Sequence, residues 1–267
     1  MSYQCPVCAS ELQKNEKQYS CSQNHSFDIA REGYVNLLLA NQKNSKEPGD
    51  SEFMVKARKS FLDAGYYDRL SDALNGLLQK QSRILDLGCG EGFYSDRLWK
   101  FFESLGTEVQ IFGIDISKTA VREAAKRNKN IEFCVGSNFK LPYKDASFDT
   151  VFSVFAPFDE KELKRVLAPG GRFICVRPAS EHLCELSALV YEKPQLQGKT
   201  LSEISDLKLI EKKSVKYQMQ LKTNQDITNL VSMTPYYWHL SEEKKAGFST
   251  KENLSVTADF EIAYYVS

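Results

Sequence analysis

The sequence predicts an α/β fold in which a mostly parallel sheet carries helices on both faces and is preceded by a small metal-binding arm. Three observations support this prediction. Strand-like and helix-like segments alternate after Arg83, a glycine-rich turn joins the first of these strands to a helix, and three of the seven cysteines lie in the first 40 residues. Alternation at this spacing is typical of parallel sheets covered by helices.

The composition is that of a folded, water-soluble protein. The chain has 267 residues, 42% of them hydrophobic and 26% charged, and 35 Lys plus Arg balance 35 Asp plus Glu. No stretch approaches the roughly twenty apolar residues of a membrane-spanning helix, and the N-terminus lacks the features of a secretory signal. We therefore expect a cytoplasmic protein. Because the net charge is zero, any binding to nucleic acid must depend on local patches.

The chain divides into three predicted parts. Residues 1–40 are polar and too few to bury a core alone, so this arm would need a metal ion to fold. Residues 41–82 begin with a polar stretch containing Pro48 and Gly49, which predicts a linker or mobile loop, and continue with two helices. Residues 83–267 form the predicted main domain.

Two amphipathic helices are predicted between the linker and the main domain. Asp50 or Ser51 can cap the first helix, whose apolar side chains recur at helical spacing until Gly65 ends it. Apolar side chains from Leu70 to Leu78 repeat this spacing and predict the second helix.

The main domain alternates strands and helices and then changes pattern. The predicted strands are 84–87, 109–114, 131–135, 148–155 and 171–176, and the predicted helices follow Gly92 and cover 119–127 and 160–167. The last part predicts strands at 207–221 and 256–266, with a helix at 226–231 between them. No long helix follows the final strand, which predicts an antiparallel edge strand at the end of the parallel sheet.

A glycine-rich turn follows the first strand of the main domain. Gly88, Gly90 and Gly92 stand at the first, third and fifth positions, whereas a dinucleotide fingerprint has glycine at the first, third and sixth. This spacing disfavours NAD and FAD. Asp115 ends the second strand about twenty residues later, where a carboxylate can accept hydrogen bonds from both hydroxyls of a ribose. The turn and the acid together favour an adenosine ligand without a pyrophosphate.

The segment from Asp86 to Gly92, together with Asp115, resembles the first motif and the second-strand acid of the class I S-adenosylmethionine-dependent methyltransferases. The resemblance implies a Rossmann-like, seven-stranded sheet whose last strand is antiparallel. It also implies that Glu91 lies beside the sulfonium end of the cofactor. The alternative is a glycine-rich turn in an unrelated α/β fold, which the strand context and the acid disfavour.

The N-terminal arm carries four residues at the spacing of a metal site. Cys5, Cys8, Cys21 and His25 form the pattern C-x2-C-x12-C-x3-H, and structural zinc takes four sulfur or nitrogen ligands in two close pairs separated by a short hairpin. We therefore predict one structural zinc ion that folds the arm. The other cysteines are scattered and are predicted to be packing residues: Cys89, Cys134, Cys175 and Cys184.

The zinc pattern and the methyltransferase motif together resemble one family, the RlmA-type 23S rRNA (guanine-N1)-methyltransferases of bacteria. The similarity runs over nearly the whole chain. Its motifs are Cys5 to Cys8, Cys21, His25, 27–28, 31–38, Pro48 to Ser51, Arg58, 61–65, Asp86 to Gly92, 133–135, Ala156 and Pro157, 169–171, His182 and Leu183, and 233–235.

This resemblance implies an activity and partners. The enzyme would use S-adenosylmethionine to methylate N1 of a guanine in a hairpin of 23S rRNA, with the zinc arm helping to hold the RNA. The substrate would be 23S rRNA or an assembling large ribosomal subunit. Relatives in other bacteria modify a neighbouring guanine of the same hairpin, so the target position stays open. The resemblance also implies a homodimer whose two subunits form an RNA cleft.

The glycine-rich turn and the resemblance together assign six residues to cofactor binding. These are Tyr67, Gly88, Gly90, Glu91, Asp115 and His182. Tyr67 would cover the cofactor, and His182 follows a strand near its carboxyl end, where such folds bind ligands. The alternatives are a core aromatic for Tyr67 and a surface helix residue for His182.

The segment after the fourth strand bears on the target atom. Guanine N1 carries a proton that must leave as the methyl group arrives, and a paired base must first be turned out of its stack. Methyltransferases that act on exocyclic amines carry Asn or Asp where this chain has Ala156, so the alanine favours a ring nitrogen. Phe155 or Phe158 can stack on the base, unless both lie in the core. Possible bases are Asp159, Glu181 and His182, and the sequence names no catalytic residue.

Three groups of basic residues could contact phosphates, but a solvated helix face is the favoured interpretation of any single group. They are Lys43, Lys46, Lys56, Arg58 and Lys59; Lys118, Arg122, Lys126, Arg127 and Lys129; and Lys161, Lys164 and Arg165.

Two other functions remain open from the sequence. A small-molecule methyltransferase of the quinone or sterol type would share the glycine-rich turn but would not need a zinc arm. A zinc-containing RNA-binding or assembly factor could keep the cofactor pocket without turnover, because intact cofactor residues do not prove catalysis.

Overall fold

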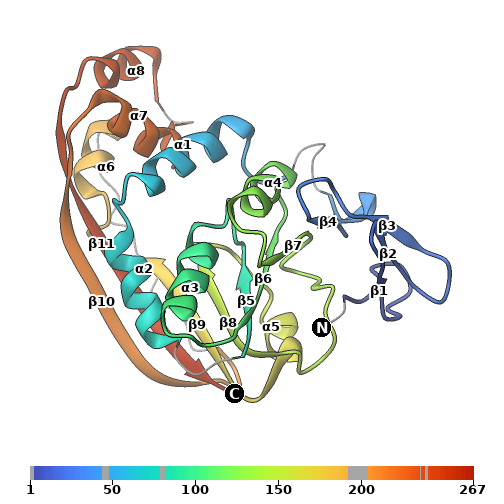
Figure 1. Ribbon diagram of the computed structural model, residues 1–267. Helices are drawn as coiled ribbons and strands as arrows, with labels where there is room; N and C mark the ends of the chain where they lie inside the picture. The colour runs from blue at the N-terminus through green and yellow to red at the C-terminus, as the bar shows by residue number, and fades with distance from the viewer. Residues whose placement is uncertain (1–2, 44–47, 79–81, 192–203, 235, 238–239) are drawn as a thin grey trace.

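The computed structural model describes residues 3–43, 48–78, 82–191, 204–234, 236–237 and 240–267. The N-terminal arm contains a three-stranded antiparallel sheet in the order β1-β2-β3, formed by Gln13–Lys14, Gln18–Ser20 and Ser26–Asp28. Figure 1 shows this arm in dark blue at one side of the molecule, beside the edge of the main sheet.

The main sheet has eight strands in the order β10-β11-β9-β8-β5-β6-β7-β4. Their bounds are β4 Val35–Asn36, β5 Arg83–Leu87, β6 Gln110–Asp115, β7 Glu132–Val135, β8 Phe148–Val154, β9 Leu167–Pro178, β10 Lys208–Leu221 and β11 Leu254–Val266. The strands from β9 to β4 pair in parallel, and β11 is antiparallel to both β9 and β10.

The seven strands predicted for the main domain are all present, as β5 to β11. The prediction that the antiparallel strand forms the edge is wrong, because β11 lies between β9 and β10. The burial pattern gives the reason: β11 is almost entirely buried, as an interior strand must be, while the lysine-rich first half of β10 is exposed. Lysines on an edge strand oppose pairing with other chains.

The eighth strand, β4, comes from the N-terminal arm. Val35 and Asn36 pair in parallel with Cys134 and Val135 of β7, and the amide of Leu37 donates a further hydrogen bond to the carbonyl of Val135. The arm therefore extends the main sheet rather than lying apart from it.

Helices cover the first face of the sheet. They are α1 Glu52–Asp63, α2 Asp68–Leu77, α3 Phe93–Ser104, α4 Lys118–Arg127, α6 Cys184–Val190 and α7 Asn224–Ser232. Two further helices precede α1 and follow α7 in the sequence: the 3-10 helix η1 Ala40–Gln42 and α8 Glu242–Ser249. Side chains of α1, α2, α3, α4, α6 and α7 join one buried cluster with Ile84 of β5. Of these elements, α6 and α8 were not predicted.

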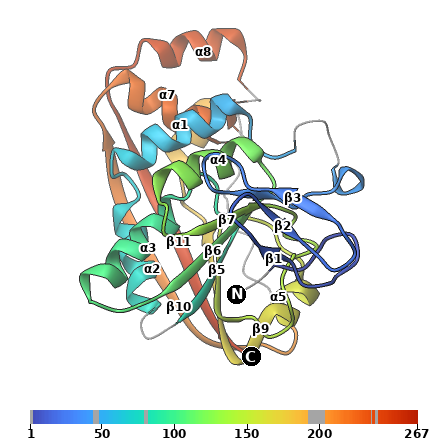
Figure 2. The same ribbon diagram turned by 45° about the vertical axis from the view of Figure 1, so that its right-hand side comes forward.

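The second face is covered by α5 (Glu160–Val166) and by the N-terminal arm. Side chains from the arm join a second buried cluster with Phe112 and Phe148 of the sheet. The ring centroid of Tyr3 lies 5.4 Å from that of Tyr143, which in turn packs edge-on against Phe148 at 4.9 Å. Figure 2 shows the arm in front of the sheet on the side that holds α5.

Local signals in the sequence account for the helix boundaries. The Ser51 hydroxyl accepts a hydrogen bond from the amide of Met54 at 3.3 Å, so Ser51 caps α1, and Asp50 instead forms an ion pair with Arg58. Gly65 follows α1 at a φ of +84°, a backbone conformation that suits glycine. In the described part of the chain, none of the helices could span a membrane.

The missing side chain of Gly92 allows the start of α3 to pack closely against α4. It caps α3 at a φ of +80°, and a Cβ there would lie 2.9 Å from Cβ of Ala124. Gly106 has a similar φ of +62° but open space around it. We expect Gly106→Ala to lower the free energy of unfolding by about 1 kcal/mol through backbone strain alone. Gly92→Ala should cost about 1–3 kcal/mol more, because α3 and α4 must separate.

Urea titrations of the two variants measure this difference. Equal losses of stability in Gly92→Ala and Gly106→Ala would show that α3 and α4 separate with no loss of free energy.

Candidate functional site

A cavity of about 940 Å³ opens at the carboxyl ends of the parallel strands β5, β6, β8 and β9. All six residues predicted to bind a cofactor line it. They are Tyr67, Gly88, Gly90, Glu91, Asp115 and His182. The volume is within the range of sites that hold small organic ligands.

The turn after β5 lies so close to the segment after β8 that a side chain on Gly88 would clash with it. A Cβ on Gly88 would lie 2.2 Å from Cβ of Ala156, which follows β8. The amides of Gly88 and Cys89 donate to the carbonyl of Ile114 at the end of β6. The backbone of the turn therefore forms the floor of the cavity, held between two neighbouring strands.

Asp115 occupies the position expected of a ribose-binding acid. Its carboxylate accepts hydrogen bonds from the amides of Gly90, at 3.0 Å, and Ser117, at 2.8 Å. Burial raises the pKa of Asp115, and these two backbone donors oppose the rise. Because a carboxylate has about four lone-pair positions, the two backbone bonds leave others available to a diol.

Glu91 is a buried carboxylate with one open oxygen. Its side chain is 2% exposed, and Oε1 accepts no hydrogen bond from the described residues. The guanidinium of Arg127 lies 3.8 Å from Oε1, too far for a hydrogen bond. Burial raises the pKa of Glu91, and the charges of Arg58 and Arg127 lower it. A carboxylate in this state fits a ligand that brings a positive charge into the cavity.

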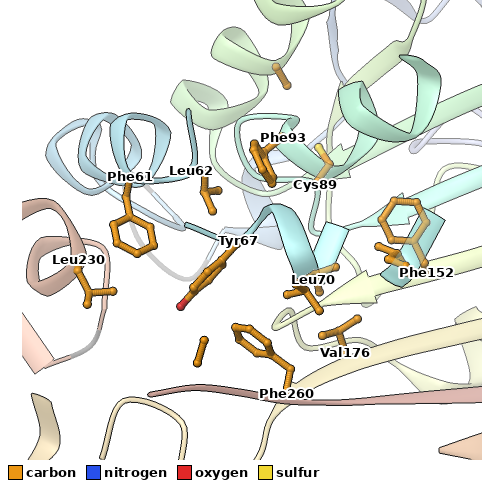
Figure 3. Close-up of a cluster of buried hydrophobic side chains, with 14 of the residues drawn as sticks. Phe61, Leu62, Tyr67, Leu70, Cys89, Phe93, Phe152, Val176, Leu230 and Phe260 are labelled. Atoms are coloured by element: carbon orange, nitrogen blue, oxygen red, sulfur yellow. The ribbon is translucent and has the colours of Figure 1, made fainter. Parts of the chain in front are cut away.

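Tyr67 and His182 line one wall of the cavity, and Phe260 packs against both of their rings. The Tyr67 hydroxyl lies 3.4 Å from Nε2 of His182, and the Phe260 ring packs edge-on against Tyr67 at 5.0 Å. Figure 3 shows Tyr67 among Phe61, Leu62 and Phe260. Tyr67 is thus both a core aromatic and a cavity residue. His182 is buried, so the alternative of a surface helix residue is wrong.

The hydrogen bonds of His182 define its tautomer. Nδ1 accepts from the backbone amide of Asp259 at 3.3 Å, so the proton of the neutral ring lies on Nε2 and points to Tyr67. Burial lowers the pKa of His182 to about 4. The ring is therefore neutral at physiological pH, and its accepting nitrogen is already used.

Phe155 has a constrained backbone at the edge of the cavity. Its φ is +60°, which is unfavourable for a bulky side chain, and the ring is 37% exposed. The ring stacks on His182 with a centroid distance of 6.3 Å. Strain of this kind is often found where a side chain is held for function.

The cavity also contains residues that were not assigned to it from the sequence or were assigned only in part, among them Asn138, Phe158, Glu160 and Arg177. Asn138 donates to the carbonyl of Pro157 at 3.0 Å, while its buried Oδ1 has no donor among the described residues. The Arg177 guanidinium lies 5.7 Å from the centre of the Phe158 ring. Their shared position is the signal that could have found them, since Arg177 lies at the carboxyl end of β9 and the others follow β7 or β8.

Two of the three possible bases lie outside the residues that line this cavity. Asp159 caps α5 by accepting from the amide of Glu162, and Glu181 forms an ion pair with Lys216 at 2.6 Å. His182 lines the cavity, but its accepting nitrogen is occupied.

The predicted zinc ligands converge, with Cys21 and His25 in the connection between β2 and β3. The ligand atoms of Cys5, Cys8, Cys21 and His25 all lie within 4.8 Å of one another. Sγ of Cys8 is 3.7 Å from Sγ of Cys21, and Sγ of Cys21 is 3.4 Å from Nδ1 of His25. A tetrahedron with zinc–sulfur distances of 2.3 Å has edges of about 3.8 Å, so the group fits zinc.

The thiol pKa values of Cys5 and Cys8 shift in opposite directions, and burial raises that of Cys5. A hydrogen bond with the Ser10 hydroxyl lowers the pKa of Cys8 to about 6, which favours the thiolate that zinc binds. Cys89, Cys134 and Cys175 are buried in the main domain, as predicted for packing residues.

Several residues of the predicted basic clusters form ion pairs with acidic side chains of the same chain. Arg127 pairs with Asp63 and Lys126 with Glu123 in the α4 group, and Arg165 pairs with Asp145 and Glu162 in the α5 group. Lys46 of the linker group lies outside the described residues.

The lowered pKa of His182 predicts a pH dependence of stability. The unfolded chain binds a proton at this residue below about pH 6.5, while the folded chain resists it down to about pH 4. Stability contributed by His182 is complete above pH 6.5 and falls as the pH drops toward 4, by up to about 3 kcal/mol. In His182→Gln this part of the decrease should disappear, while Tyr67→Phe should retain it.

Urea unfolding of the three proteins from pH 7 to pH 4 provides the measurement. Parallel curves for the wild type and His182→Gln would mean that burial does not perturb this histidine.

Metal removal tests the cysteine cluster. We expect one zinc ion per chain, and Cys8→Ser should lose it and make the arm easier to cleave, because the ligand set is then incomplete although Cys5 and Cys21 still pack in the second buried cluster. Cys184→Ser, which changes a free thiol outside the cluster, is the matched control and should keep the ion. Metal analysis and proteolysis of the arm report the outcome, and full zinc occupancy in Cys8→Ser would contradict it.

Two protein families match different parts of the chain, and each part contains one of the two sites. Residues 3–46 match the family described as "RlmA, N-terminal", and residues 78–233 match the family described as "Methyltransferase domain". The first match contains the whole cysteine cluster, and the second contains the glycine-rich turn.

Individual proteins extend this similarity. A 23S rRNA (guanine(748)-N(1))-methyltransferase of Streptomyces fradiae is 29% identical over 91% of this chain and 88% of its own length. A Micromonospora griseorubida protein named "Putative 23S rRNA (guanine-N(1)-)-methyltransferase" is 30% identical over 98% and 96% of the two lengths. A solved Bacillus halodurans structure titled "putative methyltransferase" shares the fold, with a TM-score of 0.50 and 15% identity over 75% of this chain and 98% of its own.

These matches, with the geometry of the two sites, establish the cofactors as S-adenosylmethionine and zinc. The chain belongs to the RlmA-type family of S-adenosylmethionine-dependent methyltransferases with an N-terminal zinc ribbon.

Proposed function

We propose that this protein methylates N1 of a guanine in a hairpin of 23S rRNA. The observation that carries the proposal is the likeness to guanine-N1 methyltransferases over the zinc arm and the catalytic domain together. In this proposal residues 1–40 recognise RNA, residues 41–82 link the two parts and residues 83–267 carry out methyl transfer. The enzyme acts in the cytoplasm, where rRNA is made, and a homodimer forms the RNA cleft.

The cofactor residues have separate roles in this proposal. S-adenosylmethionine supplies an electrophilic methyl group on a sulfonium ion. Asp115 accepts the ribose hydroxyls, the glycine-rich turn lets the backbone approach the ligand, and Glu91 places a carboxylate near the positive charge. Tyr67 and His182 close the cavity with a neutral, hydrogen-bonded wall, which excludes water without adding a charge.

The remaining cavity residues match the pairing edge of guanine. This edge presents N1–H and N2–H donors beside the O6 acceptor. Arg177 can donate to O6, and Glu160 and the open oxygen of Asn138 can accept from the nitrogens. As N1 loses its proton, negative charge develops on O6, and a guanidinium there stabilises it. Phe155 and Phe158 can hold the two faces of the ring.

Ala156 supports a ring nitrogen as the target. It has no side-chain acceptor for an amino group, and it lies so close to Gly88 that a Cβ on that glycine would be 2.2 Å from its own Cβ. A small-molecule substrate is the second candidate, but the arm covers one face of the sheet and carries a metal site that such a reaction does not require.

The experiment that tests the proposal combines label transfer with mapping. Purified protein is incubated with labelled S-adenosylmethionine and 23S rRNA that lacks modifications, as free RNA and as precursor particles. N1-methylguanine blocks base pairing, so reverse transcription should stop at one guanine of the hairpin. A stop at its neighbour would assign the alternative position. Label without a stop would refute the N1 assignment, and absence of label in both substrates would refute the RNA substrate.

Arg177 provides a sharper test of the chemistry. We expect Arg177→Ala to lower the single-turnover methylation rate about 100-fold near pH 7. The loss should shrink as the pH rises, because guanine N1 then ionises without help. Arg172→Ala is the control, since Arg172 lies on the same strand, over the ring of Tyr264, and outside the cavity. A pH-independent loss in Arg177→Ala would contradict this role.

A further inference from the structure

A second cavity, of about 400 Å³, lies between the zinc arm and the segment after β7. Its walls come from the turn between Cys5 and Cys8 on one side and from residues 136–145 on the other. Neither cofactor binding nor the chemistry at guanine uses this space. Its volume is sufficient for one nucleotide-sized ligand.

This cavity is the immediate neighbour of the cofactor cavity. Ser137 lines both of them. The next residues divide between the two, since Asn138 and Phe139 line the cofactor cavity and Lys140 lines the second. A polymer that placed one unit in the cofactor cavity would therefore bring an adjacent unit to the second cavity.

The walls of the second cavity are already held in place. The amide of Gln4 in the arm donates to the carbonyl of Pro142 at 2.9 Å. Arg165 donates to the carbonyls of Tyr143, at 2.6 Å, and Leu141, at 3.0 Å. Binding would thus require little ordering of the protein, which favours a built site over an incidental gap.

Lys140 is the group in the second cavity that can take a phosphate. The two acids in its wall, Asp145 and Glu162, are both paired with Arg165. Among the described residues, Lys140 forms no ion pair, so its ammonium is available. Arg165 balances the charge of one acid and Lys140 that of the other, so the wall is neutral overall and the Lys140 ammonium is its charge without an ion pair among the described residues.

The apolar surface near the mouth suits a base. Val7, in the zinc turn, is 53% exposed, and Phe139, beside the shared wall, is 59% exposed. Exposed apolar side chains next to a free lysine are typical of sites where unstacked bases rest on a protein while the backbone is neutralised.

We propose that the second cavity binds the nucleotide next to the methylated guanine, with its phosphate at Lys140 and its base against the zinc turn at Val7. This inference rests on the proposed function, because it requires an RNA substrate. It makes the zinc turn part of the contact to a single nucleotide immediately beside the target. It also gives a reason for the flipped guanine to stay unstacked, since its neighbour is held apart.

The test uses a fluorescent 23S rRNA hairpin fragment and three variants. Lys140→Ala should raise the Kd about fivefold and lower the slope of log Kd against log salt by about one. Lys140→Arg should restore binding. Lys144→Ala is the matched control, because Lys144 is four residues away, pairs with Glu11 and does not line the cavity. Zinc content and S-adenosylmethionine affinity should be unchanged in all three.

Methylation under single-turnover conditions separates the two proposals. If the wild type methylates the hairpin and Lys140→Ala needs more RNA for half-maximal rate but reaches the same maximal rate, the subsite is supported. If the wild type methylates the hairpin and Lys140→Ala equals Lys144→Ala in every measurement, the subsite is wrong and the proposed function stands. If the wild type methylates no RNA, the proposed function fails first.

Crosslinking provides an independent readout. RNA carrying 4-thiouridine beside the target guanine should crosslink to the peptide that contains Val7 or to the one that contains Lys140. A crosslink found only elsewhere on the protein would overturn the assignment. Weakened binding of Lys140→Ala to precursor particles, with unchanged binding to the hairpin, would instead assign the cavity to a ribosomal protein.

Discussion

The close approach of the backbone at the carboxyl edge of the sheet is the constraint on which the site depends. The turn after β5 lies against Ala156 at a distance that excludes any side chain on Gly88. This contact brings the ends of β5, β6 and β8 together and leaves a cavity whose floor is main chain. Three residues from different strands can therefore contact one ligand, because no side chain on Gly88 fills the space between them. They are Asp115 of β6, Phe155 after β8 and His182 after β9.

Burial of like charges makes the same region dependent on its ligand. Burial raises the pKa of Asp86 to about 8, Asp86 accepts from the Ser95 hydroxyl at 2.6 Å, and Glu91 and Asp115 add to the repulsion. Burial likewise raises the pKa of both of these neighbours. Proton uptake and a cationic ligand therefore act on the same groups. A sulfonium ligand favours the ionised acids, and protonation of the acids disfavours the ligand.

The sequence predicts the local features well because their causes are local. Periodicity and capping groups place α1 and the alternating strands, and spacing alone brings Cys5, Cys8, Cys21 and His25 together. The assignments that failed depend on distant segments. The position of β11 inside the sheet follows from pairing with β10, and the cavity face of Arg177 follows from strand order. A periodic pattern records which side chains are buried, but not which strand lies beside another.

The parallel pairing of β4 with β7 has a consequence for how the chain folds. It joins Val35 to Cys134, about a hundred residues later in the sequence, so a long loop must close before the arm can dock. During synthesis the arm leaves the ribosome first, and its aromatic residues then have no sheet to cover. Zinc gives the arm its own local source of order in that interval. Because its four ligands all lie between Cys5 and His25, the metal site closes only a short loop and can form before the long loop does.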